Sequence, residues 1–155
     1  SHAQSFTRHG WQVVHQTGKT GVEEVREAYT KAGIPAVVEP FFREMGRLWR
    51  AAEFAVSRAG AGSVAEAWAN NIPTLFLPYP YHKDEHQKYN AAALVGAGAA
   101  ELSRDRIDSK GNLLDAGARL DRVLNDSTIR GGMRCAFDAL GPADGAHKVA
   151  LALNM

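Results

Sequence analysis

The sequence predicts an α/β domain in which a parallel sheet is covered by helices on both faces, the doubly wound arrangement. Short apolar runs, rich in β-branched residues, alternate along the chain with helical segments of roughly ten residues. The runs are apolar throughout, which is typical of strands buried on both faces. With 155 residues, 45% of them hydrophobic, the chain has the size and composition of a single domain with a buried core.

The first half of the chain contains three predicted strands, each followed by a predicted helix. Valine pairs mark the first two strands, and Gly33 is expected just past the end of the first helix. The strands are 11–16, 35–41 and 53–57, and the helices are 22–33, 43–52 and 63–71.

The second half continues the same alternation. A strand bounded by prolines is predicted at 73–80, a helix at 85–98 and a short last strand at 99–102. Two or three further helices are expected within 112–153. In this class of fold, ligands bind beyond the carboxyl ends of the strands, on the loops that lead into helices.

Charge and composition exclude several functional classes. The 18 basic and 17 acidic residues leave a formal net charge of +1, which does not suit a nucleic-acid binder. The single cysteine, Cys135, excludes an internal disulfide framework, is compatible with a reducing compartment and is interpreted as structural. No signal peptide is recognisable, and the longest apolar run, residues 91–100, is too short to span a bilayer. We therefore expect a soluble or peripheral intracellular protein.

The loop SRAGAGSVAEAW, residues 57–68, joins the third predicted strand to its helix and allows two interpretations. In the first, Ser63 is the N-cap and Glu66 completes a capping box three residues later. That interpretation does not explain the small residues at 60–62. In the second, the small residues let a phosphate approach backbone N–H groups at the helix N-terminus, and Glu66 accepts hydrogen bonds from a neighbouring sugar diol.

A second polar segment, LPYPYHKDEHQKYNAA at 77–92, follows the next strand and is expected at the same edge of the sheet. One interpretation is a metal site formed by His82, Asp84 and His86, although no HExxH pattern is present. In another, Asp84 and Glu85 stabilise the positive end of the helix dipole, and the other polar residues are solvated.

A third interpretation of this segment is recognition of a polyhydroxylated ligand by Gln87, Asn90 and one histidine. Amide side chains donate and accept hydrogen bonds at once, which suits hydroxyl groups. The neighbouring loop, with its candidate phosphate site, favours this interpretation.

The segment from residue 57 to 100 resembles the carboxy-terminal donor-binding domain of the MurG-type UDP-N-acetylglucosamine transferases, which are glycosyltransferases of family 28 with the GT-B fold. Residues 13–33 and 37–58 resemble the same family, and the resemblance extends to near the C-terminus. Its most specific motifs are the small-residue loop with its glutamate and the segment HKDEHQKYN at 82–90.

The resemblance implies roles for residues at the nucleotide. Glu66 matches a glutamate that binds the ribose hydroxyls of UDP. Ala61, Gly62 and Ser63 match positions near the diphosphate and the sugar. Phe42 matches a position whose backbone amide and carbonyl contact the edge of uracil.

The resemblance also implies contacts to the N-acetylglucosamine of the donor. Gln87 matches the second of two adjacent polar residues that contact this sugar, and His86 stands where many members have glutamine. Asn90 matches a nearby polar position of the same motif. Arg58 matches a basic residue of the small-residue loop and is expected to brace it.

The activity implied by the resemblance is inverting transfer of N-acetylglucosamine to the lipid-linked muramoyl-pentapeptide precursor of peptidoglycan. Helix N-terminal amides at Gly62 and Ser63 would stabilise the leaving diphosphate, so we expect no metal and no cofactor besides the UDP-sugar donor substrate. The intact enzyme is expected to be cytoplasmic and peripheral on the inner face of the cell membrane.

The sequence lacks segments that the family has. No counterpart is found for the amino-terminal acceptor domain, nor for the first strand and glycine-rich loop of the donor half; residues 1–14 match the helix after that loop. We therefore expect residues 1–155 to be a single donor-nucleotide-binding domain, a fragment that is inactive alone. By resemblance the missing domain carries the general base, the lipid-acceptor pocket and the contact with the membrane, so this chain has no assigned catalytic residue.

Two other functions stay open at this point. One is a UDP-sugar 2-epimerase domain, which needs acid and base carboxylates facing the sugar; the motif HKDEHQ is not typical of these enzymes. The other is a non-catalytic UDP-sugar-binding subunit of a split transferase.

Overall fold

The computed structural model describes residues 3–81 and 86–153 of the chain. The described strands are β1 (Val13–Gln16), β2 (Ala36–Glu39), β3 (Ala55–Ser57), β4 (Thr74–Phe76) and β5 (Ala100–Leu102). The helices of the first half are α1 (Ala3–Arg8), α2 (Val22–Ala32), α3 (Met45–Ala51) and α4 (Ala61–Ala69). The later helices are α5 (His86–Gly96), α6 (Ser109–Asn112), α7 (Ala118–Asn125), α8 (Ser127–Leu140) and α9 (Gly145–Leu153), with a π-helical turn (Leu113–Gly117) between α6 and α7.

The strands alternate with helices and all paired strands are parallel, which confirms the predicted α/β class. Within the described residues they form two sheets, a two-stranded sheet of β1 and β2 and a three-stranded sheet in the order β3-β4-β5. This division was not expected, because apolar periodicity indicates where strands lie and not which of their edges pair.

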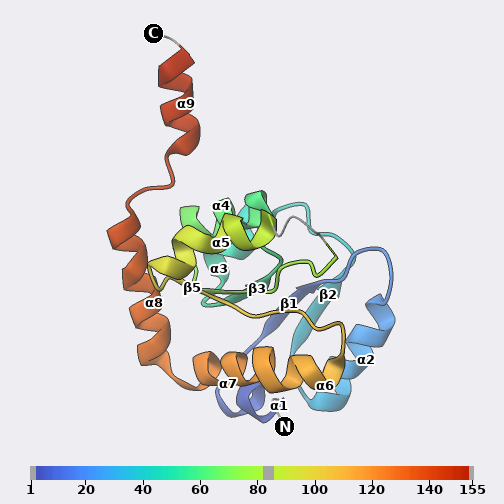
Figure 1. Ribbon diagram of the computed structural model, residues 1–155. Coiled ribbons are helices and arrows are strands. Elements are labelled where there is room, and N and C mark those ends of the chain that lie inside the picture. The colour runs from blue at the N-terminus through green and yellow to red at the C-terminus, as the bar shows by residue number, and fades with distance from the viewer. Residues whose placement is uncertain (1–2, 82–85, 154–155) are drawn as a thin grey trace.

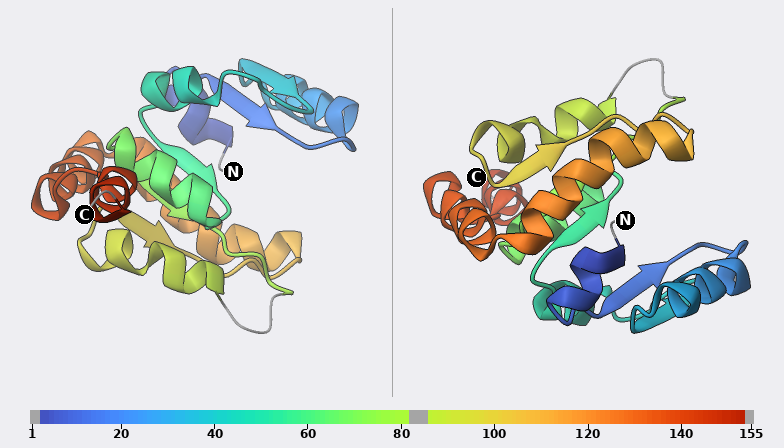
Figure 2. Two further views of the ribbon diagram at one scale, coloured as in Figure 1. Left: turned by 90° about the horizontal axis from the view of Figure 1, so that it is seen from above. Right: turned by 90° about the horizontal axis from the view of Figure 1, so that it is seen from below.

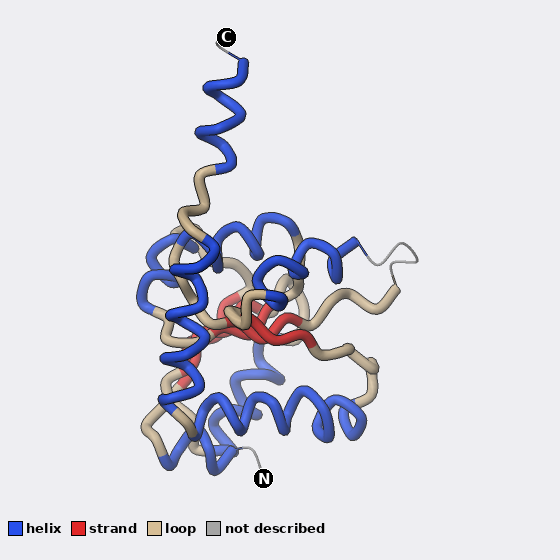
Figure 3. Tube along the Cα trace, turned by 60° about the vertical axis from the view of Figure 1, so that its left-hand side comes forward, coloured by secondary structure: helices blue, strands red, loops and turns tan. Residues whose placement is uncertain are grey.

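Helices cover the three-stranded sheet on both faces. Helices α4 and α5 lie over one face and α7 over the other (Figure 1), and the views from above and below show them on opposite sides (Figure 2). Helix α2 packs against β2 in the smaller sheet. Helix α9 projects away from the body of the molecule, and the loops after β4 and β5 leave the strands on the same side (Figure 3).

The hydrophobic core lies between the three-stranded sheet and helices α3, α4, α5 and α8. Phe76 and Leu94 are completely buried, and Phe137 reaches the same cluster from α8. Trp49 joins it from α3. This packing holds the ends of β3 and β4, and with them the loops that carry the predicted site residues. Among the described helices, none is long and apolar enough to cross a membrane.

Candidate functional site

The two loops with predicted site residues lie side by side at the carboxyl edge of the larger sheet. Ser57 ends β3 directly opposite Phe76 at the end of β4, and the Leu77 N–H donates to the Ser57 carbonyl at 2.8 Å. The carboxyl ends of adjacent parallel strands are where ligands bind in α/β folds. The alternating pattern of the sequence therefore located the edge of the sheet correctly.

Helix α4 presents free backbone donors at this edge. Gly60 is its N-cap, without a side-chain hydrogen bond, and the first helical bond runs from the Val64 N–H to the Gly60 carbonyl at 3.0 Å. The N–H groups of Ala61, Gly62 and Ser63 have no hydrogen-bond partner in the described part of the chain. Together with the helix dipole, such groups form an anion-binding site.

Nothing in the described fold requires glycine at positions 60 and 62. Neither residue has a positive φ, and a methyl group added at either one would meet no non-neighbouring described atom within 4 Å. Glycine in a helix costs about 0.5–1 kcal/mol relative to alanine. At the N-cap, position 60, glycine is itself a favoured residue. Gly62, inside the helix, carries this cost without a reason in the described fold.

The predicted capping box is wrong. Ser63 is the third residue of α4 and not its N-cap, because the helix begins at Ala61, two residues earlier than predicted. The Glu66 carboxylate does not reach back to the helix start; its Oε2 accepts a hydrogen bond from the indole Nε1–H of Trp49 in α3 at 2.9 Å. Glu66 therefore does not cap this helix, and its Oε1 has no hydrogen bond within the described residues.

Arg58 connects the loops after β3, β4 and β5. Its Nη1 donates to the Leu77 carbonyl at 3.0 Å, and its Nη2 lies 2.7 Å from Oδ2 of Asp105. The guanidinium carbon also lies 5.8 Å from the centroid of the Tyr79 ring. Through these contacts Arg58 links the loops after β3, β4 and β5.

Asp105, which the sequence analysis did not single out, is the anchor of this brace. Burial raises the pKa of its carboxyl, but hydrogen bonds from Asn112 and the Ile107 N–H, and the hydrogen bond and charge of Arg58, outweigh burial and lower the pKa. Asp105 therefore stays ionised beside Arg58 at neutral pH. Its position after β5, at the same carboxyl edge, is the signal that could have identified it.

Helix α5 brings its polar residues to the same loops. The Gln87 Oε1 accepts from the Tyr79 N–H at 2.8 Å, and the Asn90 Nδ2 donates to the Ala59 carbonyl at 3.1 Å. Within the described residues, the amide N–H groups of Gln87 and the amide oxygen of Asn90 have no hydrogen-bond partner. His86 is exposed at the start of the described helix.

The metal interpretation depends on residues that the structure does not describe. His82 and Asp84, like Glu85, lie outside the described residues. Within residues 3–81 and 86–153, no group of three His, Cys, Asp or Glu side chains could hold a metal ion.

Phe42 lies apart from the other predicted site residues. It follows β2, and its N–H donates to Oε1 of Gln16, at the end of β1, at 3.1 Å. Among the described residues, no hydrogen bond connects Phe42 to α4 or α5. The structure thus brings together the small-residue loop, Arg58, Gln87 and Asn90, while Phe42 stands at the carboxyl end of the other sheet.

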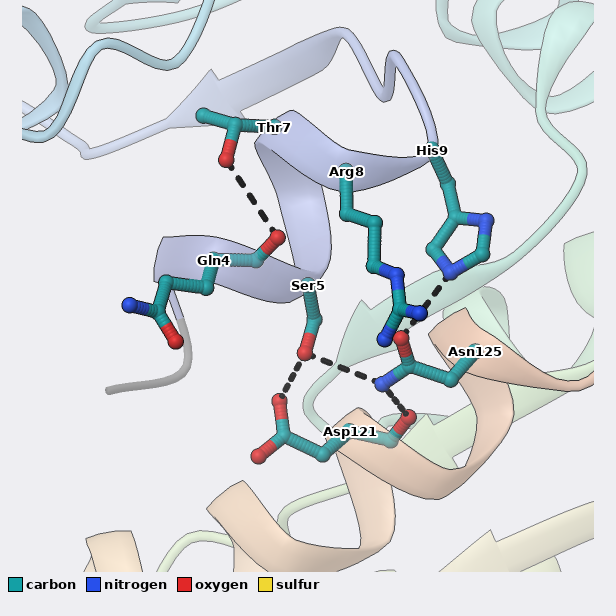
Figure 4. Close-up of a pocket in the computed structure, with 7 residues that line it drawn as sticks. All are labelled: Gln4, Ser5, Thr7, Arg8, His9, Asp121 and Asn125. Atoms are coloured by element: carbon teal, nitrogen blue, oxygen red, sulfur yellow. Dashed lines mark hydrogen bonds between the residues drawn. The ribbon is translucent and has the colours of Figure 1, made fainter.

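A hollow of about 790 Å³ lies elsewhere, between α1 and α7 (Figure 4). Its side chains pair with one another: the Ser5 hydroxyl donates to Asp121 at 2.8 Å, Asn125 donates to Ser5 at 2.9 Å, and His9 lies 3.0 Å from Asn125. Trp11, just before β1, donates to the Leu124 carbonyl, which places this hollow near the amino ends of the strands. It is therefore not the candidate site.

Comparisons with known proteins show what the chain is similar to. The model of the glycosyltransferase family 28 C-terminal domain matches residues 1–125. A relative from Trichlorobacter lovleyi, named UDP-N-acetylglucosamine–N-acetylmuramyl-(pentapeptide) pyrophosphoryl-undecaprenol N-acetylglucosamine transferase, is 41% identical over 79% of this chain and 38% of its own length. A relative of the same name from Desulforudis audaxviator is 38% identical over 89% of this chain and 38% of its own length. The chain thus spans 38% of the length of each of these relatives.

A solved structure supports the fold. The crystal structure of MurG from Acinetobacter baumannii matches with a TM-score of 0.77 over 99% of this chain and 48% of that chain, at 24% sequence identity. At this identity the match shows the same fold.

Proposed function

Because the chain belongs to glycosyltransferase family 28 as its C-terminal domain, we propose that it is the donor-binding part of an enzyme that transfers N-acetylglucosamine from UDP-N-acetylglucosamine to a lipid-linked acceptor in peptidoglycan synthesis. The observation that carries the proposal is the start of α4, where the N–H groups of Ala61, Gly62 and Ser63 have no partner among residues 3–81 and 86–153. Gly62 leaves the first turn of this helix open without a reason within the described fold. A diphosphate is an anion of the size and charge that suits such a helix end.

In the proposed reaction the acceptor hydroxyl attacks the anomeric carbon of N-acetylglucosamine while the bond from that carbon to the diphosphate breaks. UDP leaves with additional negative charge, and the N–H groups at the start of α4 would stabilise that charge. The proton of the acceptor hydroxyl passes to a general base that we place outside this chain. No step in this scheme requires a metal ion.

The remaining residues of the site suit the other parts of the donor. Glu66 would accept hydrogen bonds from the ribose hydroxyls, since an ionised carboxylate is an acceptor only. The N–H groups of Gln87 and the oxygen of Asn90, which have no partner among the described residues, would bind the hydroxyl and N-acetyl groups of the sugar, with His86 beside them. Arg58 has its guanidinium engaged by Leu77 and Asp105, so we propose a bracing role for it.

We also propose that further chain completes this domain and the enzyme. The strand order, β2-β1 and then β3-β4-β5, becomes the doubly wound order 3-2-1-4-5-6 when one more parallel strand lies between β1 and β3. Val14 and Val37 face each other in β1 and β2 and are both more than half exposed, although parallel sheets are normally covered on both faces. An acceptor domain would supply the base, the acceptor site and the contact with the inner face of the membrane.

The proposal is tested by calorimetric titration of the chain with UDP, UDP-N-acetylglucosamine and, for comparison, ADP. Binding of the uridine nucleotides is expected, with Glu66→Ala weakening it by about 1–3 kcal/mol because hydroxyl groups lose their acceptor. Glu53→Ala is the matched control, since this exposed carboxylate lies before β3 and away from the carboxyl edge. Equal affinity for ADP and UDP, or no binding by a folded chain, would contradict the proposed donor site.

A further inference from the structure

Trp49 connects the hydrophobic core with the candidate site. Its ring packs in the core, and its only polar side-chain atom contacts a candidate site residue. The side chain comes from α3 and is 6% exposed, within the main hydrophobic cluster. Its indole Nε1–H donates to Oε2 of Glu66 at 2.9 Å. A buried tryptophan N–H needs a hydrogen-bond partner, and a carboxylate is a strong one.

We propose that Trp49 is a positioning residue that holds the Glu66 carboxylate ready for the ribose diol, and so makes the site selective for ribonucleotides. This inference rests on the proposed function. Glutamate is a flexible side chain, and ordering it only when the ligand arrives would weaken binding. The indole, fixed by its packing, orders one carboxylate oxygen before the ligand binds.

The chemistry of the pair suits two adjacent hydroxyl groups. The indole has one donor and no acceptor, so it occupies only one lone pair of the carboxylate. The structure gives Oε1 of Glu66 no hydrogen bond within the described residues. The remaining lone pairs can accept from the 2′-hydroxyl and the 3′-hydroxyl of a ribose.

In a purely structural interpretation, the only role of Glu66 is to accept the hydrogen bond of the buried indole N–H. The two interpretations differ in what the loss of the N–H does to nucleotide selectivity. If Trp49 positions Glu66, losing the N–H weakens ribonucleotides and leaves nucleotides without ribose hydroxyls unaffected. If Trp49 only supports the fold, any loss of affinity is the same for both.

The test is calorimetry of the chain with UDP and with 2′,3′-dideoxy-UDP, comparing wild type with Trp49→Phe. Wild type is expected to bind UDP at least about tenfold more tightly than the dideoxy nucleotide, and Trp49→Phe is expected to lose most of that difference. Trp68→Phe is the matched control, because this partly buried indole packs against the same core cluster and also makes one hydrogen bond, to the Gly141 carbonyl at 2.9 Å. An unchanged preference in a folded Trp49→Phe, or an equal loss for both nucleotides, would overturn the inference.

A measurement on the wild-type chain keeps the inference testable if Trp49→Phe does not fold. With ¹⁵N-labelled tryptophan, the indole N–H resonance of Trp49 should shift on addition of UDP and much less with the dideoxy nucleotide, while that of Trp68 stays in place. A Trp49 resonance that does not respond to bound UDP would overturn the inference and leave the donor site standing. Failure of wild type to bind UDP would instead contradict the proposed function itself.

Discussion

Gly62→Ala should make the chain more stable and the donor site weaker. Gly62 is the second residue of α4, its φ is not positive, and an added methyl group would meet no non-neighbouring described atom within 4 Å. Alanine therefore fits this helix and should raise the free energy of unfolding by about 0.5–1 kcal/mol. In a chain of this size that gain corresponds to a rise in Tm of roughly 1–4 °C.

The same methyl group enters the space where the diphosphate would approach the helix end. We expect the loss of at least one charge-assisted hydrogen bond, and an affinity for UDP that falls about tenfold or more. Thermal unfolding without ligand and calorimetric titration with UDP measure the two effects separately. Opposite signs are the mark of a residue kept for binding at the expense of stability.

Gly46→Ala is the control for this pair of measurements. Gly46 is the second residue of α3, just as Gly62 is the second residue of α4, and its added methyl group also meets no non-neighbouring described atom within 4 Å. It should give a similar gain in Tm with unchanged affinity. If Gly62→Ala binds UDP as wild type does, or if it lowers Tm, the reasoning that links Gly62 to a ligand is refuted.

Three further predictions concern the brace, the core and the role of metal. Asp105→Asn should lower the free energy of unfolding at pH 7, because it removes the ionic partner of Arg58. Folding lowers the pKa of Asp105 from an ordinary value of 3.8, so the difference in stability between wild type and variant should shrink as the pH falls below that value. Urea titrations at pH 7 and pH 3 that give the same difference would contradict this sign. Phe76→Ala should cost about 3–5 kcal/mol in urea unfolding, because the ring is completely buried, whereas a cost under about 1 kcal/mol would mean that this part of the core is described wrongly. EDTA should leave the affinity for UDP unchanged in calorimetry, and a large loss reversed by added Mg²⁺ would show that a metal takes part in donor binding.

The sequence was sufficient to predict the class of fold and to place the loops with the candidate site residues at one edge of the sheet. The alternation of apolar runs and helical segments placed β3, α4, β4 and α5 in the right order, and it follows that their connecting loops meet at one edge. The capping signal in the sequence predicted the wrong first residue for α4. Ser63 is a good N-cap residue, but the turn after β3 lets the helix begin earlier, with Gly60 as the cap.

Contacts between distant segments could not be predicted. Trp49 and Glu66 lie on different helices, and the sequence around either residue does not indicate that the two form a hydrogen bond. The salt bridge of Arg58 with Asp105 depends likewise on β3, β4 and β5 lying in one sheet. The division into two sheets is also a tertiary property, because the apolar pattern of a strand does not name its neighbour.

The most direct test of the account is an NMR titration of the ¹⁵N-labelled chain with UDP. If the diphosphate binds at the start of α4, the amide resonances of Ala61, Gly62 and Ser63 should show the largest shifts. Shifts concentrated instead at Ser5, Asp121 and Asn125, around the hollow between α1 and α7, would contradict the proposed site while leaving the assignment to the family intact.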